Sequence, residues 1–146
     1  MELSPELKND ILTVISKIPI VDTLEMEIVS LADGHCETKV QRKPGYDGVA
    51  KSFHGGLLMT IADSAACFAI FTKTGPFVRL TTTDMNIRFL APCFTDVTVK
   101  ANVIKLGRTL CPVAVDLYDA DGKRVAVAQV SYFLIDSPPA TGRFVE

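Results

Sequence analysis

The spacing of hydrophobic and polar residues changes along the chain, and each change predicts a different element. Ser4 followed by Pro5 is typical of a helix start, and apolar residues then recur at helical spacing over about residues 4–18. From Leu24 onward, apolar residues alternate with polar ones, and the turn signal Asp33-Gly34 divides this alternating run in two. The first forty residues therefore predict a lead-in helix followed by a β-hairpin.

One segment, residues 53–73, is apolar nearly all round and closes at Gly75-Pro76. A helix with this pattern needs protein on most of its sides. Its longest apolar stretch, residues 57–71, contains Asp63 and is shorter than the roughly 20 residues that a membrane helix requires. The segment therefore predicts the buried helix of a soluble protein.

Four strand-like runs follow the long helix, near residues 78–90, 96–106, 109–118 and 124–135. Consecutive strands with short connections favour an antiparallel sheet, and long strands twist and curl. Pro112 inside the third run indicates an edge position or a bulge there. We therefore predict an α+β fold in which a curled antiparallel sheet wraps around one long central helix. Residues 1–146 should form a single domain, with a loose tail after about residue 136.

Composition narrows the class of protein. A chain of 146 residues with 48% hydrophobic content can build one core without disulfides, and a formal net charge of −2 argues against a nucleic-acid or anionic-membrane binder. The four cysteines are far apart and lie in apolar or strand-like runs, where a free thiol behaves as a small hydrophobe. The acidic N-terminus does not resemble a signal peptide. We expect no metal site and a cytoplasmic location.

Asp63 is the candidate chemical group of the long helix. Its neighbours along the helix are apolar, and burial among them should raise the pKa of the carboxylate. A carboxylate with a raised pKa suits a general base or a water-activating group near neutral pH. The alternative is a structural acid at the helix rim, or one paired with a strand lysine.

Gly55 and Gly56 stand where this helix should begin. Glycine there lets a carbonyl approach backbone N–H groups at the positive end of the helix dipole, as in an oxyanion hole; the alternative is an ordinary loop. Asp63 lies eight residues beyond Gly55, about 12 Å along a helix, which is too far for both to act on one carbonyl. If both act, Gly55 of one chain faces Asp63 of another. The sequence thus predicts at least a homodimer. A homotetramer is favoured, but the choice between dimer and tetramer stays open because one chain does not show which sheet face stacks.

Two motifs together resemble a known family. The first motif is His54-Gly55-Gly56-Leu57, with Asp63 nine residues after the histidine. The second is the run Asp84-Met85-Asn86-Ile87-Arg88-Phe89-Leu90-Ala91-Pro92. Together they make the chain similar to the PaaI-type thioesterases of the hotdog-fold superfamily. The resemblance spans about residues 20–135. It implies a hotdog fold and an acyl-CoA thioesterase that hydrolyses an acyl or aryl thioester to a carboxylate and free CoA thiol. It implies no metal and no cofactor.

The resemblance also implies the roles of the catalytic candidates. The N–H of Gly55 would polarise the thioester carbonyl, and Asp63 of the facing subunit would attack it or activate water. Thr82 would supply a hydroxyl that positions the water. Its neighbours Thr81 and Thr83 could do so instead, because the strand register decides which of the three points inward.

Other candidates follow from the same resemblance. His54 would support the loop geometry, although a structural histidine bonded to backbone explains it equally well. Gly56 and Asn86 join the substrate-binding candidates. Family members often carry Asn or Gln six residues before the histidine, whereas this chain has Gly48 there. Either the adjacent Asp47 takes over the polar contact or it is a solvated loop acid.

The run Lys105-Leu106-Gly107-Arg108-Thr109 joins two predicted strands. Two cations, a hydroxyl and a flexible glycine suit phosphate binding, and the resemblance places this turn near the nucleotide end of coenzyme A. The alternative is an ordinary charged hairpin turn. Gly107, Arg108 and Thr109 are accordingly substrate-binding candidates.

Two other functions stay open from the sequence. One is a non-catalytic acyl-CoA-binding hotdog protein, which would be expected to lack the acid that Asp63 supplies. The other is a hotdog dehydratase of 3-hydroxyacyl thioesters, in which His54 and Asp63 would act on the substrate backbone. The His-Gly-Gly helix start favours the thioesterase.

Overall fold

The computed structural model describes residues 1–136, and the predicted loose tail lies outside the described residues. Its elements, in chain order, are α1 Pro5–Ile15, α2 Pro19–Thr23, β1 Glu27–Ala32, β2 His35–Val40, the short 3-10 helix η1 Pro44–Tyr46, α3 Gly55–Thr74, β3 Leu80–Phe89, β4 Val97–Val103, β5 Leu110–Tyr118 and β6 Arg124–Leu134.

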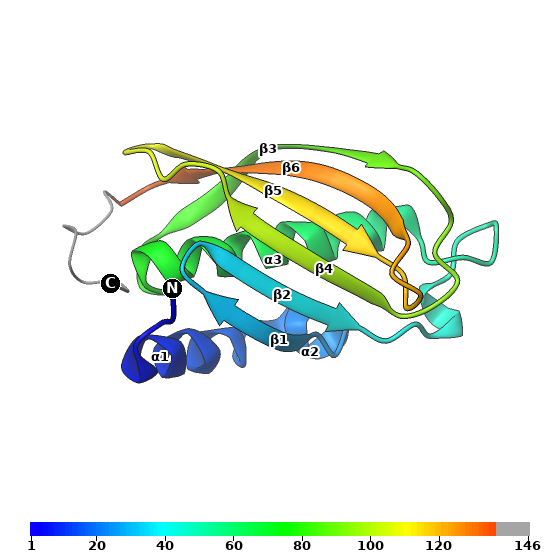
Figure 1. The fold of residues 1–146 in the computed structure, drawn as a ribbon, viewed down its shortest axis with the longest axis horizontal. Coiled ribbons are helices and arrows are strands. Elements are labelled where there is room, and N and C mark those ends of the chain that lie inside the picture. The colour runs from blue at the N-terminus through cyan, green and yellow to red at the C-terminus, as the bar shows by residue number, and fades with distance from the viewer. Residues whose placement is uncertain (137–146) are drawn as a thin grey trace.

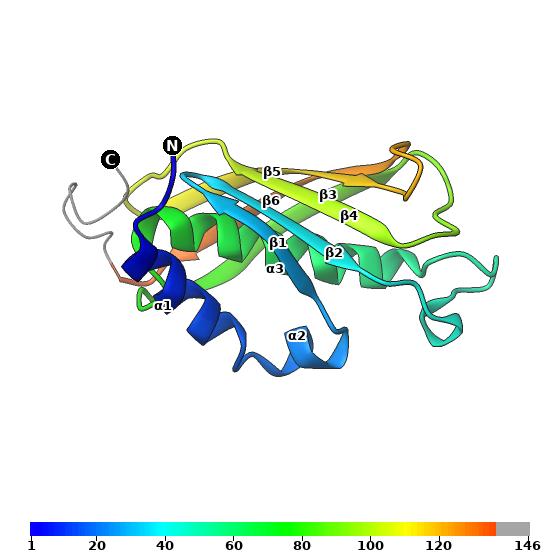
Figure 2. The same ribbon diagram turned by 60° about the horizontal axis from the view of Figure 1, so that its bottom comes forward.

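The six strands form one antiparallel sheet in the order β1-β2-β4-β5-β6-β3. The sheet curls around α3, and α1 packs against α3 beside the β1 edge (Figures 1 and 2). Because α3 carries the chain from β2 to the far side of the sheet, β3 joins β6 and becomes an edge strand. The predicted α+β fold, with a curled antiparallel sheet around one long helix, is confirmed.

Alternate residues of the strands point at α3 and form the core, as expected for a sheet with one buried face. Among them are Cys36, Val40, Val97, Val99, Ala101, Cys111, Val113, Val115 and Leu117. The face of α3 toward the sheet carries Ala62, Ala65, Ala66 and Ala69, whose small side chains allow close approach. By length and composition α3 could also cross a membrane, but in this fold it is the central helix and more than half of it is buried.

The N-terminal region differs in detail from the prediction. Ser4 caps α1 as expected, but α1 ends at Ile15, and a second short helix, α2, precedes the hairpin. The alternating apolar and polar residues that start at Leu24 do not form a strand at once, because Glu25 adopts a left-handed φ of 51° in the turn after α2. The predicted strand start at Leu24 is therefore wrong by a few residues, and β1 begins at Glu27.

The edge or bulge prediction for Pro112 is also wrong. Its strand β5 lies between β4 and β6, and the register with β6 is regular at Pro112, which faces Ser131. The proline is tolerated because it lies opposite Ile104, just beyond Val103, where β4 ends. Its carbonyl still accepts a 2.9 Å hydrogen bond from the N–H of Ile104, and its missing N–H removes only the last bond at the end of this ladder.

Candidate active site

The start of α3 is built by His54. This residue is the N-cap, and its Nδ1 accepts a 2.9 Å hydrogen bond from the N–H of Gly56. The N–H of His54 in turn donates to the carbonyl of Tyr46, which anchors the preceding loop. A Cβ at Gly56 would lie only 3.0 Å from the imidazole ring, so glycine there makes room for the cap. The structural role that the sequence left open for His54 is thus observed.

Gly55 presents the open donor at this helix start. The N–H of Gly56 is bound by the His54 ring, and those of Leu57 and Leu58 donate to the carbonyl of His54. Within residues 1–136, the N–H of Gly55 donates no hydrogen bond. A free N–H at the positive end of a 20-residue helix is suited to bind a carbonyl oxygen or an oxyanion.

A hollow of about 400 Å³ adjoins Gly55. Most of its lining residues have apolar side chains, while polar atoms form about half of its wall: Ser52, Phe53, Gly55, Leu58, Phe89, Leu90, Ala91, Pro92 and Cys93. The exposed ring of Phe89 lies directly over the glycine, because a Cβ at position 55 would come within 3.0 Å of its Cζ. A hydrophobic acyl group could therefore lie beside the free N–H.

Asp63 lies two turns further along α3 and is half-buried. Its Oδ1 accepts two hydrogen bonds of 2.7 Å, one from the hydroxyl of Thr82 and one from that of Tyr132. Hydroxyl donors stabilise an ionised carboxylate. Among the described residues no donor reaches Oδ2, and no lysine pairs with Asp63. The sequence-based alternative of a lysine-paired acid is therefore not what the geometry shows.

A bulge in β3 explains why Thr82 points at the helix. The register with β6 shifts between Thr82 and Asp84, so Thr83 is an extra residue on the edge strand. Thr82 is consequently half-buried and faces Asp63, while Thr81 and Thr83 are exposed. The expectation that Thr82, of the three threonines, points inward is confirmed.

Two further groups near Asp63 were missed by the sequence analysis. Tyr132 comes from β6, where it pairs with Thr82 across the strands, and Cys67 lies one turn beyond Asp63 in α3. Burial, together with the nearby charge of Asp63, raises the pKa of Cys67 to about 12. Burial is also the main cause that raises the pKa of Tyr132. Both groups are therefore protonated at neutral pH. The one available signal was that a buried tyrosine hydroxyl needs a partner.

Asp47 and Gly48 lie in the loop before α3. Asp47 forms a two-pronged ion pair with Arg42, whose guanidinium pKa is raised by that hydrogen bond. Gly48 lies against His54, since a Cβ there would be 3.4 Å from the imidazole Cδ2. The carboxylate of Asp47 therefore has a structural partner, and substrate contact by either residue stays a prediction.

The remaining substrate-binding candidates lie away from Gly55. Asn86 is exposed on β3, on the sheet face opposite Thr82. The β4–β5 loop with Gly107, Arg108 and Thr109 lies at the other end of α3 (Figure 1). Gly107 shapes this loop, because a Cβ there would lie 2.6 Å from the carbonyl oxygen of Leu110. One chain therefore does not bring the loop and the free N–H of Gly55 together.

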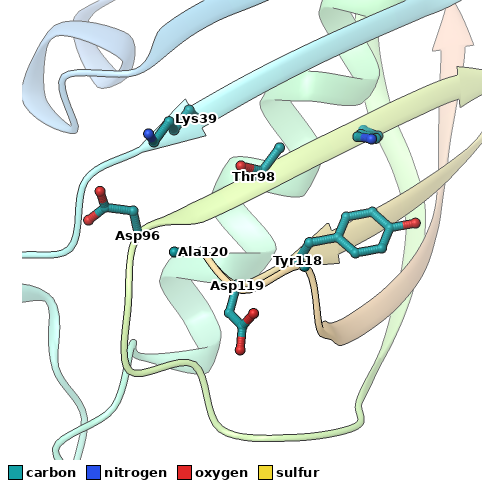
Figure 3. A pocket seen from close by; sticks show the side chains of 8 residues that line it. Lys39, Asp96, Thr98, Tyr118, Asp119 and Ala120 are labelled. Atoms are coloured by element: carbon teal, nitrogen blue, oxygen red, sulfur yellow. The ribbon is translucent and has the colours of Figure 1, made fainter.

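A second hollow, of about 450 Å³, lies on the outer face of the sheet (Figure 3). Lys39, Thr98 and Tyr118 line it from three neighbouring strands, together with Asp96 and Asp119. The ammonium of Lys100 lies 5.4 Å from the centroid of the Tyr118 ring. The residues of this polar hollow are on the opposite side of the sheet from Asp63 and are not part of the candidate active site.

Comparison with known proteins places this geometry in a family. The chain matches the family model of the Thioesterase superfamily over residues 50–126. It is 35% identical to human acyl-coenzyme A thioesterase 13 over 109 residues, covering 70% of this chain and 74% of that protein. The mouse protein of the same name is 31% identical over 127 residues, covering 81% and 87%.

Solved structures agree on the fold. The PaaI protein from the phenylacetic acid degradation operon of E. coli superposes with a TM-score of 0.83 at 20% identity, covering 94% of this chain and 99% of PaaI. A thioesterase family protein from Silicibacter pomeroyi gives a TM-score of 0.82 at 22% identity, covering 90% and 99%. On the family match, the sequence identity and the fold, this chain belongs to the thioesterase superfamily and has its hotdog fold.

Proposed function

We propose that the protein is an acyl-CoA thioesterase that hydrolyses an acyl or aryl thioester to a carboxylate and free CoA thiol. The observation that carries the proposal is the carboxylate of Asp63, which two hydroxyls hold by Oδ1 while no donor from residues 1–136 reaches Oδ2. The free N–H of Gly55 supports it as a donor for the carbonyl oxygen. The names of the human and mouse relatives support the substrate class.

The proposed site is shared between two subunits. Gly55 and Asp63 are separated by eight residues of one helix, about 12 Å, so a single chain cannot bring both to one carbonyl. The edge strand β3 supports a dimer, because a ten-residue edge is a template for pairing with another strand. Phe89 and Leu90 at its end are 51% and 56% exposed, which favours their burial by a second copy.

Pairing of two β3 edges about a two-fold axis would set the two α3 helices antiparallel. The β4–β5 loop at the end of one helix would then approach the start of the other. In this arrangement Arg108 and Thr109 of one subunit would bind the phosphates of a coenzyme A whose thioester lies at the partner's Gly55. Leu110 and Phe133, neighbours on the outer sheet face and 50% and 42% exposed, support further association to a tetramer.

The proposed chemistry uses only protein groups and water. The thioester carbonyl oxygen accepts from the N–H of Gly55, and Asp63 of the facing subunit takes a proton from the water that adds to the carbonyl carbon. The tetrahedral intermediate then expels the CoA thiolate, which recovers the proton. If Asp63 instead attacks the carbon itself, the CoA thiolate leaves and an acyl–aspartyl anhydride forms. Water that opens this anhydride at the Asp63 carboxyl carbon puts oxygen-18 into Asp63 and leaves the product of a single turnover unlabelled, whereas activated water labels the product.

The test is a panel of aryl and aliphatic acyl-CoAs, with free thiol measured as the product. The proposal expects thiol release from members of the panel. Formation of an enoyl product from a 3-hydroxyacyl-CoA without thiol release would instead identify a dehydratase, and tight binding without turnover would identify a non-catalytic acyl-CoA-binding protein.

The four free cysteines support a cytoplasmic location as part of the same proposal.

A further inference from the structure

Tyr132 has no part in the chemistry proposed so far, yet it makes the closest contacts to Asp63 together with Thr82. Its hydroxyl lies 2.7 Å from Oδ1 of Asp63 and 2.9 Å from the backbone carbonyl oxygen of the same residue. The side chain is buried, only 6% exposed. Tyr132 therefore contacts both the side chain and the main chain of the proposed catalytic residue.

We propose that Tyr132 is a positioning residue for Asp63, whose hydroxyl, with that of Thr82, occupies Oδ1 and so leaves Oδ2 as the reacting oxygen. This inference rests on the proposed function. Thr82 alone holds the carboxylate from β3, whereas Tyr132 holds it from the neighbouring strand β6. Two donors from different strands fix the direction of the carboxylate more firmly than one.

The rigidity of Tyr132 suits this task. Its ring has two side-chain torsions and is packed at a sheet position flanked by Thr82 on β3 and Cys111 on β5. Burial keeps the phenol protonated, since it raises the pKa of Tyr132, so the hydroxyl remains a donor across the neutral range. A preorganised donor of this kind costs little reorganisation during the reaction.

A purely structural role is the competing explanation, because a buried tyrosine hydroxyl needs a partner wherever it lies. Removing it by Tyr132→Phe would lower stability under either explanation. The two differ in catalysis. A positioning residue changes the rate constant of the bound complex and the pH at which Asp63 becomes active, whereas a structural residue changes only the thermal midpoint.

The experiment compares Tyr132→Phe with Tyr118→Phe, a matched control whose ring lies on the outer face of the sheet (Figure 3). For Tyr132→Phe we expect kcat to fall about tenfold to a hundredfold and KM to stay within about twofold, because a hydrogen bond to a charged group is lost. The control should keep both constants. A Tyr132→Phe protein with unchanged kcat and a lower thermal midpoint would overturn the inference.

The pH profile gives a second readout. Loss of a donor favours the protonated carboxylate, so the acid limb of kcat/KM should move to higher pH in Tyr132→Phe. The other titratable group that faces Asp63 among the described residues is Cys67, which stays protonated in this range because its pKa is about 12. An acid limb at the same pH in variant and parent would contradict the inference.

A fluorinated tyrosine covers the case in which Tyr132→Phe does not fold. The chain has three tyrosines, so 3-fluorotyrosine incorporated into Tyr46→Phe/Tyr118→Phe protein labels Tyr132 alone. The fluorinated phenol is a stronger hydrogen-bond donor than tyrosine, so the acid limb of kcat/KM should move to lower pH. An acid limb at the same pH as in the unlabelled protein would overturn the inference. Asp63→Asn distinguishes a failure of the proposed function from a failure of the inference about Tyr132. Thiol release retained in Asp63→Asn refutes the proposed function. An inactive Asp63→Asn together with an unaffected Tyr132→Phe refutes only the inference.

Discussion

The two halves of the candidate site lie on the same helix but are built in different ways. At the start of α3, Gly55 offers a backbone N–H whose direction is set by the neighbouring His54 cap. In the middle of α3, Asp63 offers a side chain whose direction is set by Thr82 and Tyr132, which lie 19 and 69 residues further along the chain. The first half is local, and the second depends on the sheet being complete.

This difference teaches which changes each half should tolerate. The backbone half depends on helix geometry and on an available N–H, so it should respond to substitutions that remove the N–H and little to those that keep it. The side-chain half depends on chemical identity at Asp63 and on donors from two strands. Each half can therefore be broken separately without unfolding the other.

The largest effect is expected from Asp63→Asn. The amide keeps the shape of the side chain but can neither accept a proton from water nor attack the carbonyl. We expect thiol release to fall by about a thousandfold or more, the range of a lost general base or nucleophile. Asp121→Asn, in the exposed β5–β6 turn, is the matched control and should keep full activity. Retained activity in Asp63→Asn would refute its role.

A somewhat smaller effect is expected from Gly55→Pro. Proline is tolerated at the first position of a helix, and His54 already has the extended conformation, φ −58° and ψ 129°, that precedes proline. The substitution therefore removes the N–H while keeping the helix. We expect kcat to fall by about a hundredfold to a thousandfold, as for one lost oxyanion donor.

Gly55→Ala is the control for that change. It adds a Cβ against Phe89, as proline does, but keeps the N–H. Because the close contact is with Cζ, the far end of the Phe89 side chain, a small rotation of the ring can relieve it, and the loss should stay below about tenfold. Equal losses in the two variants would show that space at position 55, and not its donor, matters for the reaction.

The smallest effect is expected at His54. Its observed task is to cap α3, so His54→Ala should lower the free energy of unfolding by about 1 kcal/mol, while His54→Asn should retain the cap. Thermal or urea unfolding measures the difference. A His54→Asn protein that is as stable as the parent yet as inactive as Asp63→Asn would show that His54 acts on the substrate.

The same contrast explains how far the sequence could predict this molecule. Local signals, namely the spacing of apolar residues and the position of turn residues, predict the long helix, its end at Gly75 and the four later strands. Gly55 and Asp63 could be found in the same way, because both lie within one helix. The strand start at Leu24 was misjudged because alternation of buried residues arises in a helix-capping turn as well as in a strand.

What the sequence could not predict depends on pairing between distant segments. Thr82 joins Tyr132 at Asp63 only because β3 crosses to the far edge and pairs with β6 in the register that sets the two residues opposite each other. The bulge at Thr83 is invisible in a run of three threonines, yet it decides which one faces inward. Pro112 was misassigned for the same reason, since the end of the β4 ladder is a property of the sheet.

The central claim is that Gly55 of one subunit and Asp63 of its partner form one site. It is tested most directly by mixing two inactive chains, one with Gly55→Pro and one with Asp63→Asn, under separate affinity tags and purifying the mixed dimer. One of its two sites then contains both intact halves, so thiol release should recover to about half of the parent dimer. A mixed dimer as inactive as either variant alone would contradict the shared site.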